Sequence, residues 1–412
     1  MKNSLSKSLK FINSHALAIL IIFLFSGFMG MIFIIGLRHS FWGDEWHFVD
    51  TIKYFGKNFS LVTLLDYDQV TAPMIFMIFA LWGKIFGFEI EILRLLSLAI
   101  SAATVFSIFH LYSKTLSSKK IALFSVLIIF LNPYFWGLSF FVFTDIPTLF
   151  FLILTALAVY YEKPSFLFLA SSAALLSRQY SVYFAAAAGL FFLIRFIRGD
   201  KFQIKNIAAL ILSTIPLLVL MFFWGGSAPP SGVEKWIVDD PQIYHFSFIT
   251  TYITFTALYL FPALFILRKN IFRNRFLIAL TLAFSVWFFF FPVSASYVSL
   301  LQTDRDTVGL LHRLIKYILQ FPALISFTLW LFFWLGLIFL SLIIKEDYER
   351  LKTGIWDYGH FLTLGFLFFL LIMPLSYQVW EKYLIIVLPF VLLRLMMLNF
   401  RNKINLEGKY GE

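Results

Sequence analysis

Residues 15–37 read HALAILIIFLFSGFMGMIFIIGL, and residues 42–47, shortly after this run, read WGDEWH. A helix needs about 20 apolar residues to cross a bilayer. The run therefore predicts a first membrane helix, and the lack of a small-residue cleavage site after it favours a retained helix over a removed signal peptide. Residues 42–47 then place two carboxylates between tryptophans, with a histidine directly after them, at one membrane surface.

The composition of the whole chain agrees with this first segment. Of the 412 residues, 61% are apolar and 13% are charged, whereas a soluble domain has about 25% charged residues. This excludes a soluble globular enzyme, a disordered chain and a collagen-like fibre, and it predicts an all-α, polytopic membrane protein. Because the chain has no cysteine, disulfides, thiolate catalysis and cysteine-ligated metals are excluded as well.

Apolar runs of suitable length predict twelve membrane helices with both chain ends on the inner, cytoplasmic face. No internal period and no low-complexity linker divides them, so we expect one membrane domain over residues 1–412. The predicted spans are 15–37, 92–113, 121–140, 146–161, 165–177, 181–197, 206–224, 247–267, 276–293, 319–344, 358–376 and 380–399.

The distribution of charge supports this topology. The net charge of +11 resembles that of a nucleic-acid-binding protein, but 22 of the 33 basic residues fall on the predicted inner face, as the positive-inside rule requires. Of the 22 acidic residues, 14 fall on the outer face. We therefore predict a membrane partner and no nucleic acid.

Three long loops are expected on the outer face, at 38–90, 225–246 and 294–318. The apolar run 72–88 lies inside the first loop, and counting it as a crossing would turn the basic clusters outward. We therefore predict a short interfacial or re-entrant helix there, covered by protein. The segment 225–232, GGSAPPSG, is interpreted either as a flexible lid or as a plain surface connection.

Ionisable residues beside membrane helices are costly unless paired, which makes them candidates for function. On the predicted outer face they recur in six groups. These are Asp44, Glu45 and His47; Asp66 and Asp68 before Pro73; Asp145 in Phe143-Thr144-Asp145; Arg178 and Gln179; Arg305, His312, Arg313 and Lys316; and Glu381, Lys382 and Tyr383.

Each group also has a purely structural interpretation. Residues 42–47 suit an interfacial aromatic belt, and residues 304–316 suit a solvated loop face. Asp66, Asp68 and Asp145 suit helix caps, and Arg178 would then pair with Asp145. Lys382 would extend its ammonium group to the interface. A functional interpretation is favoured because all six groups collect on one face, where a substrate with an anionic head group and a lipid tail would lie.

The order of these motifs resembles one family of membrane enzymes. Asp44-Glu45 with His47, then Tyr54, Asn58-Phe59 and residues 66–73, are similar to the first luminal loop of the dolichyl-phosphate-glucose α-1,2-glucosyltransferases, of the GT-C class. The resemblance continues along most of the chain. It includes Phe143-Thr144-Asp145, Arg178-Gln179-Tyr180-Ser181-Val182, Trp224-Gly225-Gly226, Asp304-Arg305 with His312-Arg313, and Glu381-Lys382-Tyr383 with Leu388-Pro389.

This resemblance implies a GT-C fold and transfer of a hexose, with glucose favoured, from a polyprenyl-phosphate donor to a glycan or glycolipid acceptor. The acceptor hydroxyl needs a base, for which Asp44 is the first candidate and Glu45 the second. Asp145 would orient the acceptor or stabilise the sugar cation. Arg178, Arg305, His312, Arg313 and Lys382 are candidates to hold the leaving phosphate. His47, Asp66, Asp68, Gln179 and Tyr383 complete the predicted substrate-binding set.

Neither a metal nor a cofactor is predicted, and direct displacement would invert the anomeric centre. The active face would be periplasmic, extracellular or luminal, and the carrier lipid, dolichol or undecaprenol, is left open. Two other functions stay open. One is a transporter or flippase of a lipid-linked sugar, although that class favours charges near the midplane. The other is a GT-C mannosyl- or arabinosyltransferase with a different acceptor.

Overall fold

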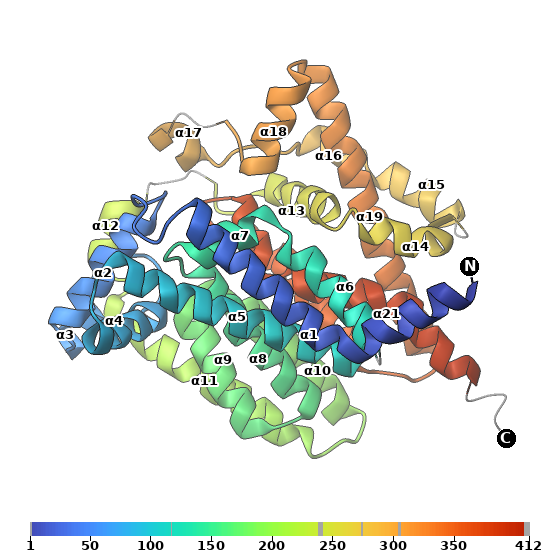
Figure 1. Ribbon diagram of the computed structural model, residues 1–412, viewed down its shortest axis with the longest axis horizontal. Helices are drawn as coiled ribbons and strands as arrows, with labels where there is room; N and C mark the ends of the chain where they lie inside the picture. The colour runs from blue at the N-terminus through green and yellow to red at the C-terminus, as the bar shows by residue number, and fades with distance from the viewer. Residues whose placement is uncertain (1, 117, 238–241, 273–274, 304–305, 408–412) are drawn as a thin grey trace. The chain divides into compact units, whose positions relative to one another are not determined.

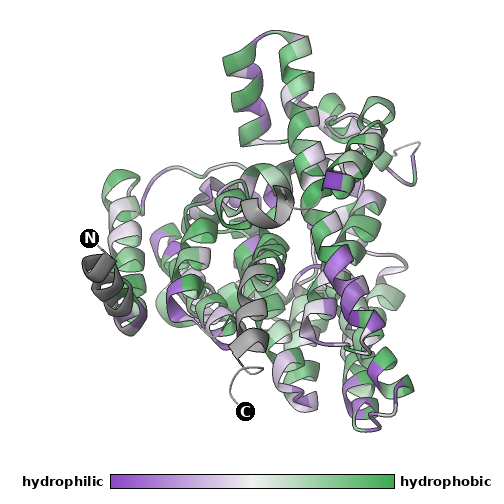
Figure 2. Cartoon of the chain, turned by 90° about the vertical axis from the view of Figure 1, so that its right-hand side faces the viewer, coloured by the Kyte–Doolittle hydropathy of each residue, from purple (hydrophilic) through white to green (hydrophobic). Residues whose placement is uncertain are grey.

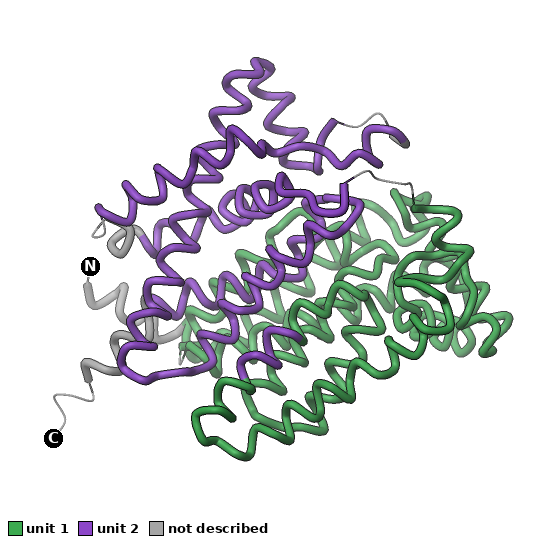
Figure 3. Tube along the Cα trace, turned by 180° about the vertical axis from the view of Figure 1, so that it is seen from behind, with its two compact units in different colours: residues 1–185, 192–237 green, residues 186–191, 238–412 purple. Residues whose placement is uncertain are grey.

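The structure is a computed structural model that describes residues 2–116, 118–237, 242–272, 275–303 and 306–407. Each regular element within these ranges is a helix, so the predicted all-α class is confirmed. Side chains are described from residue 12 to 398, except at 117, 238–241, 268–274 and 302–305. The chain packs as two compact units, which Figure 3 shows in two colours.

Unit 1 comprises residues 1–185 and 192–237. At its centre, α8 packs against both α5 and α9, and α9 packs against α11 (Figure 1). The helices are α1 (Lys2–Ile34), α2 (Glu45–Lys57), α3 (Leu61–Leu65), α4 (Met74–Phe86), α5 (Ile90–Thr115), α6 (Lys119–Phe130), α7 (Pro133–Phe140), α8 (Asp145–Tyr161), α9 (Pro164–Ser177), η1 (Gln179–Ser181), most of α10 (Val182–Ile197), α11 (Gln203–Trp224) and α12 (Pro230–Trp236).

Unit 2 comprises residues 186–191 and 238–412. Its longest helix, α19, packs along α13 and α15, and α20 packs against α21. The helices are α13 (Phe246–Tyr259), α14 (Ala263–Phe272), α15 (Arg275–Phe284), α16 (Trp287–Phe290), α17 (Tyr297–Thr303), α18 (Leu310–Leu319), α19 (Pro322–Lys352), α20 (Tyr358–Ile372), η2 (Met373–Leu375), η3 (Glu381–Ile386) and α21 (Leu388–Glu407).

Local sequence explains several of the helix ends. The Asn132 side chain accepts a hydrogen bond from the backbone N–H of Tyr134 and Pro133 occupies the first turn, so α7 starts immediately after α6. The two helices meet at a bend of 72°. Gly225 ends α11 in the left-handed conformation, with φ of +68°, which a residue with a Cβ adopts less readily.

Six described helices are long and apolar enough to cross a membrane, and the bent pair α6–α7 makes up to seven. The chain is therefore a multi-pass integral membrane protein, and apolar residues dominate these helices (Figure 2). The six are Ile12–Ile34, Ile90–Thr115, Gln179–Ile197, Gln203–Trp224, Pro322–Lys352 and Tyr358–Leu375.

The other predicted spans contain shorter apolar helices. The predicted spans 146–161 and 165–177 correspond to α8 and α9, which have 17 and 14 residues. The predicted span 276–293 is divided between α15 and α16. Since about 20 residues are needed to cross a bilayer, the count of twelve crossings, the side of each chain end and the outer-facing loops stay predictions. The run 72–88 forms α4, whose 13 residues are too few for a crossing.

Candidate functional site

The Asp44-Glu45 motif forms the turn that enters α2. Gly43 has a φ of +58°, and Asp44 follows as the residue that precedes the helix. The Asp44 side chain is 47% exposed, and its Oδ1 lies 3.9 Å from Nε2 of His47, one helical turn on. Asp44 is thus a carboxylate presented at the surface of the turn beside an imidazole.

Glu45, the neighbouring carboxylate, is fully buried. Its two oxygens accept hydrogen bonds from Nε and Nη2 of Arg94, at 2.9 and 2.6 Å. They also accept the backbone N–H groups of Val142 and Trp42, at 2.9 and 3.2 Å. With both oxygens bonded twice, Glu45 has the environment of a positioning residue, which favours that role over the base predicted from the sequence.

Arg94, on α5, was not among the predicted site residues. Its guanidinium is fully buried and donates to the carbonyl oxygens of Leu37, His39 and Ser40 as well as to Glu45. It also lies over the ring of Phe141, 4.9 Å from the centroid. Arg94 therefore fixes the chain between α1 and α2, and so the position of Asp44. An arginine inside an apolar run was the signal in the sequence.

Asp145 and Arg178 form a second buried pair. The Nη2 of Arg178 lies 3.1 Å from Oδ2 of Asp145, and both Nε and Nη2 donate to the hydroxyl of Thr144, at 2.9 and 2.6 Å. The pairing that sequence suggested as a structural interpretation is therefore present. The Oδ1 of Asp145 is also buried but has no hydrogen-bond partner among the described residues. A buried acceptor without a partner is suited to a hydroxyl donor from a ligand or a water.

The two acidic segments are neighbours in unit 1. The backbone N–H of Val142 bonds to Glu45, and the ring of Phe143 lies 5.8 Å from that of Phe48 on α2. The segment that leads into Asp145 thus packs directly against the start of α2, which brings the Asp44 turn and the Asp145–Arg178 pair into one region of unit 1.

His47 lines the same region. His47 is buried, and its ring lies 4.6 Å from the ring of Trp236 and 5.0 Å from that of Trp46. Its Nδ1 is buried without a hydrogen-bond partner among the described residues. The imidazole is therefore held by aromatic contacts with one nitrogen towards Asp44.

Asp66 and Asp68 hold α12. The two Asp66 oxygens accept the backbone N–H and the hydroxyl of Ser231, at 3.1 and 2.9 Å. Asp68 accepts from Lys235 and from Thr51, at 2.6 and 2.9 Å, and its carbonyl oxygen accepts the indole N–H of Trp236. Burial acts to raise the pKa of Asp68, but the hydrogen bonds and the charge of Lys235 outweigh it and lower that pKa.

Gln179 ties three segments together. Its amide nitrogen donates to the carbonyl oxygens of Val70 and Ser227, at 2.8 and 3.0 Å, and its oxygen accepts the N–H of Ala72 at 3.2 Å. Together with the Asp66 and Asp68 contacts, this fixes the segment 227–236 on the first loop. These contacts favour a surface connection over a lid for the Gly- and Pro-rich segment. They also show that Asp66, Asp68 and Gln179 stabilise the packing of unit 1.

In unit 2, Glu381 binds the start of α18. Its carboxylate accepts the backbone N–H groups of Leu311 and His312, at 3.0 and 2.7 Å, and the hydroxyl of Tyr259 at 2.7 Å. Negative charge at a helix N-terminus is favourable. Glu381 was expected at the start of a span, and the structure uses it to orient α18.

The other predicted substrate-binding residues of unit 2 lie in different environments. Burial and the nearby Lys316 lower the pKa of His312 to about 4, and its Nδ1 accepts the N–H of Val308. His312 is therefore uncharged near neutral pH. Arg313 is exposed, Lys382 is half-buried and Tyr383 is buried. Arg305 lies outside the described residues.

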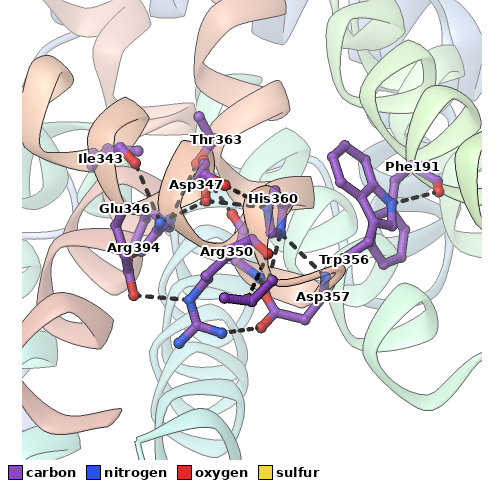
Figure 4. Close-up of polar contacts among 12 residues, drawn as sticks. Phe191, Ile343, Glu346, Asp347, Arg350, Trp356, Asp357, His360, Thr363 and Arg394 are labelled. Atoms are coloured by element: carbon purple, nitrogen blue, oxygen red, sulfur yellow. Dashed lines mark hydrogen bonds and ion pairs between the residues drawn. The ribbon is translucent and has the colours of Figure 1, made fainter. Parts of the chain in front are cut away.

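A further charged cluster, absent from the sequence predictions, joins α19, α20 and α21 (Figure 4). Arg394, almost fully buried, bonds to Glu346 and Asp347 at 2.5 and 2.7 Å. Arg350 bridges Glu346 and Asp357, and the Asp357 side chain caps α20. Because the cations and carboxylates pair among themselves, the cluster fastens three helices to one another.

Within the described residues, no group of three His, Asp or Glu side chains is placed to hold a metal ion. The region of unit 1 around Asp44, His47, Asp145 and Arg178 offers instead a surface carboxylate, an imidazole, an unbonded buried carboxylate oxygen and a guanidinium. Such a set can accept a proton from a hydroxyl and orient a polar group beside it.

Comparison with known proteins gives one family match and two distant structures. The model of a family described as "Dolichyl-phosphate-mannose-protein mannosyltransferase" matches residues 70–224. No curated protein matches the chain. Two crystal structures of ArnT from Cupriavidus metallidurans, one in the apo state and one bound to undecaprenyl phosphate, are 11% identical, with TM-scores of 0.44 and 0.45. They cover 93% and 94% of this chain, and the chain covers 76% and 78% of theirs.

These structural likenesses are too distant to transfer a residue or an activity. The family match covers the segment with Arg94, Asp145, Arg178 and Gln179, whereas Asp44 lies before it. The more specific resemblance to the dolichyl-phosphate-glucose α-1,2-glucosyltransferases stays a prediction.

Proposed function

We propose that this membrane protein is a glycosyltransferase that moves a sugar from a polyprenyl-phosphate-linked donor to a glycan or glycolipid acceptor. The observation that carries the proposal is the Asp44 carboxylate, held at the surface of its turn by the buried Glu45–Arg94 pair and packed beside the Asp145–Arg178 segment. The match of residues 70–224 to a family named for a dolichyl-phosphate sugar donor supports the same class.

In this proposal Asp44 is the base. The acceptor oxygen attacks the anomeric carbon, its proton passes to the Asp44 carboxylate, and the bond from that carbon to the phosphate oxygen breaks. The polyprenyl phosphate leaves with the electron pair of that bond, and direct displacement inverts the anomeric centre. A phosphate ester leaves without prior protonation, so one base is enough for the step.

The remaining residues of this region orient the reactants. The Oδ1 of Asp145 would accept a hydrogen bond from a sugar or acceptor hydroxyl, and Arg178 holds that carboxylate in place. His47 lies beside Asp44, with its Nε2 3.9 Å from Oδ1 of that carboxylate, and would help to orient it. Glu45 and Arg94 are positioning residues, because their contacts are with each other and with backbone groups.

The sugar and the acceptor are finer parts of the proposal. The motif order favours glucose, and a mannosyl or arabinosyl donor with another acceptor is the alternative within the same reaction class. The donor's leaving phosphate requires a cation, and Arg178 is the predicted phosphate contact that shares a unit with Asp44.

The test is transfer by the purified protein in nanodiscs. Radiolabelled polyprenyl-phosphate glucose and mannose are offered with acceptors extracted from membranes. Asp44→Asn should lower the transfer rate at least about 100-fold, the usual contribution of a positioned base, and should leave donor binding in place. Asp50→Asn is the matched control, because Asp50 is an exposed carboxylate on the same helix.

Full transfer by Asp44→Asn would contradict the assignment of the base. If the unaltered protein bound the donor but transferred sugar to no acceptor, the proposed enzymatic function would be contradicted. A carrier of the lipid-linked sugar would then be favoured.

A further inference from the structure

The loop between α1 and α5 exposes a group of large apolar side chains. Three of them, Phe59, Leu61 and Val62, lie where α2 gives way to α3, and two, Ile85 and Phe86, lie at the end of α4. Val62 and Ile85 are 75% and 73% exposed. We call these five residues the apolar corner. None of them belongs to the proposed catalytic region, so their exposure requires its own explanation.

Contacts within unit 1 hold the two parts of the apolar corner together. The ring of Phe88 packs against Gly56 on α2 and Gly83 on α4 so closely that an added Cβ would lie 2.3 and 2.4 Å from it. The ammonium group of Lys84 lies 5.4 Å from the centre of the Phe59 ring. The ends of α2 and α4 are therefore neighbours, and the corner is one surface.

The turn that presents Leu61 and Val62 is a formed structure. The hydroxyl oxygen of Ser60 caps α3 by accepting the backbone N–H of Thr63 at 3.3 Å. The hydroxyl of Thr63 in turn donates to the carbonyl oxygen of Asn58. The two apolar side chains are thus directed outward by a capped helix start.

The start of α5 shows at which depth this surface lies. Because α5 is long and apolar enough to cross a membrane, its first turns lie near the membrane surface. Arg94, in those turns, bonds to Glu45 at the beginning of α2, and Phe88, two residues before α5, packs on Gly56 at the end of α2. Both ends of α2 are therefore near the start of α5, so α2 runs along the membrane surface.

The end of α4 lies at the same level. The indole N–H of Trp82 donates to the carbonyl oxygen of Ile92 in the first turn of α5, at 3.0 Å. Phe86 precedes the first residue of α5 by four positions. Apolar side chains exposed beside the start of a membrane helix are at the depth where lipid acyl chains begin. The membrane itself is therefore the partner that suits the apolar corner.

Lysines at the edge of the corner agree with a lipid partner. Lys57 and Lys84 are exposed, and neither forms an ion pair with a carboxylate among the described residues. A lysine can lay its apolar stem along such a surface while its ammonium group reaches the lipid phosphates. Phosphate groups are present in zwitterionic and anionic phospholipids alike, so this contact requires no particular lipid.

We infer that α2 lies flat on the bilayer and that the apolar corner inserts among the acyl chains of the adjoining leaflet, with Lys57 and Lys84 at the level of the phosphates. The beginning of α2, and with it the Asp44 turn, then lies at the depth of the lipid head groups. This inference does not depend on the proposed function, because it concerns the position of a surface and not a reaction.

The test uses the absence of cysteine, which lets one introduced cysteine carry a single label. Val62→Cys and Ile85→Cys are each labelled with the fluorophore NBD in nanodiscs of phosphatidylcholine that carries a nitroxide near the start of one acyl chain. Both labels should be quenched by the nitroxide lipid and protected from iodide in the water. Glu234→Cys is the control, because Glu234 is an exposed carboxylate on α12 of the same unit, and it should show the reverse.

A charge reversal tests the lysines. In the protein labelled at residue 62, Lys84→Glu should lower quenching by the nitroxide lipid and increase quenching by iodide, since a carboxylate is repelled by the phosphates. Lys114→Glu is the matched control, because Lys114 is an exposed lysine at the opposite end of α5, and it should leave both signals unchanged.

Quenching of residues 62 and 85 by iodide and not by the nitroxide lipid would overturn the inference. Protection of both labels from both quenchers would overturn it too, since it would show that protein, such as a second copy of the chain, covers the corner. Equal lipid quenching at Glu234→Cys, or the same effect from Lys84→Glu and Lys114→Glu, would likewise contradict it.

Discussion

Arg94 and Glu45 form a forked ion pair across 49 residues of sequence, with two hydrogen bonds of 2.9 and 2.6 Å and no exposure of either side chain. A charge in such a place is tolerated because every oxygen and most of the guanidinium are bonded. The pair joins α5 to the turn that presents Asp44, so the geometry of the proposed base depends on a residue that never touches substrate.

We predict that Arg94→Ala strongly destabilises the protein. Removal of one partner leaves the Glu45 carboxylate buried without its cation, a change that costs about 3–5 kcal/mol. The measurement is thermal unfolding in detergent, followed by the loss of helical circular dichroism. Arg38→Ala is the control, since the Arg38 side chain is 87% exposed and pairs with Glu91 at the surface; it should cost less than about 1 kcal/mol. Equal melting temperatures for the two variants would contradict the prediction.

Gly232→Ala should displace α12 from the first loop. A Cβ at Gly232 would lie 2.4 Å from the carbonyl oxygen of Gln69, and backbone in that position cannot rotate away. Because the indole of Trp236 bonds to Asp68 in this contact, quenching of tryptophan fluorescence by acrylamide should increase. Gly226→Ala is the control, because a Cβ there meets no atom within 4 Å. Unchanged quenching in Gly232→Ala would show that the close approach is not needed.

The contact between Asp68 and Lys235 should weaken in acid. The pKa of Asp68 is lower in the folded state than in the unfolded chain. The stabilisation that the ionised Asp68 provides is therefore complete above its pKa in the unfolded chain, near 3.9. It is lost as the pH falls through its pKa in the folded state. Fluorescence of Trp236 should report this loss below about pH 4. In Lys235→Gln the transition should move to higher pH, since the cation that lowers the pKa is absent. An identical acid transition in the variant would contradict this assignment.

His312 should make the stability of unit 2 depend on pH in a different window. In the folded state its pKa is about 4, against an ordinary value of 6.5. Well above pH 6.5 it is neutral in both states, and as the pH falls from there towards 4 the proton binds to the unfolded chain first. Stability should therefore decline by about 2 kcal/mol between pH 7 and pH 5. His312→Gln should reduce this slope in thermal unfolding, and a slope equal to that of the unaltered protein would refute the prediction.

The sequence predicted the helical class and most of the polar segments, because apolar runs and the charges between them are local signals. Local signals also suggested that Arg178 pairs with Asp145, and their side chains do form an ion pair. The partner of Glu45 could not be found in this way. Arg94 stands within an apolar run, and nothing in the spacing shows which carboxylate it reaches.

The role of Glu381 was equally hidden. A glutamate before an apolar run suggests an interfacial charge, but two of the groups that bind its carboxylate are backbone N–H groups of α18, about 70 residues earlier in the chain. Backbone donors carry no residue-specific signal, so sequence cannot identify such a cap. For the same reason, the hydrogen bond from the N–H of Ser231 to Asp66 could be identified from the structure but not from the sequence.

Arg94 holds the chain before Asp44 through the carbonyl oxygens of Leu37, His39 and Ser40. Those oxygens are present whatever side chains stand at the three positions. The anchor therefore does not depend on the side chains at positions 37, 39 and 40, and a fluorescent label attached at position 39 or 40 would report on the turn while these hydrogen bonds remain.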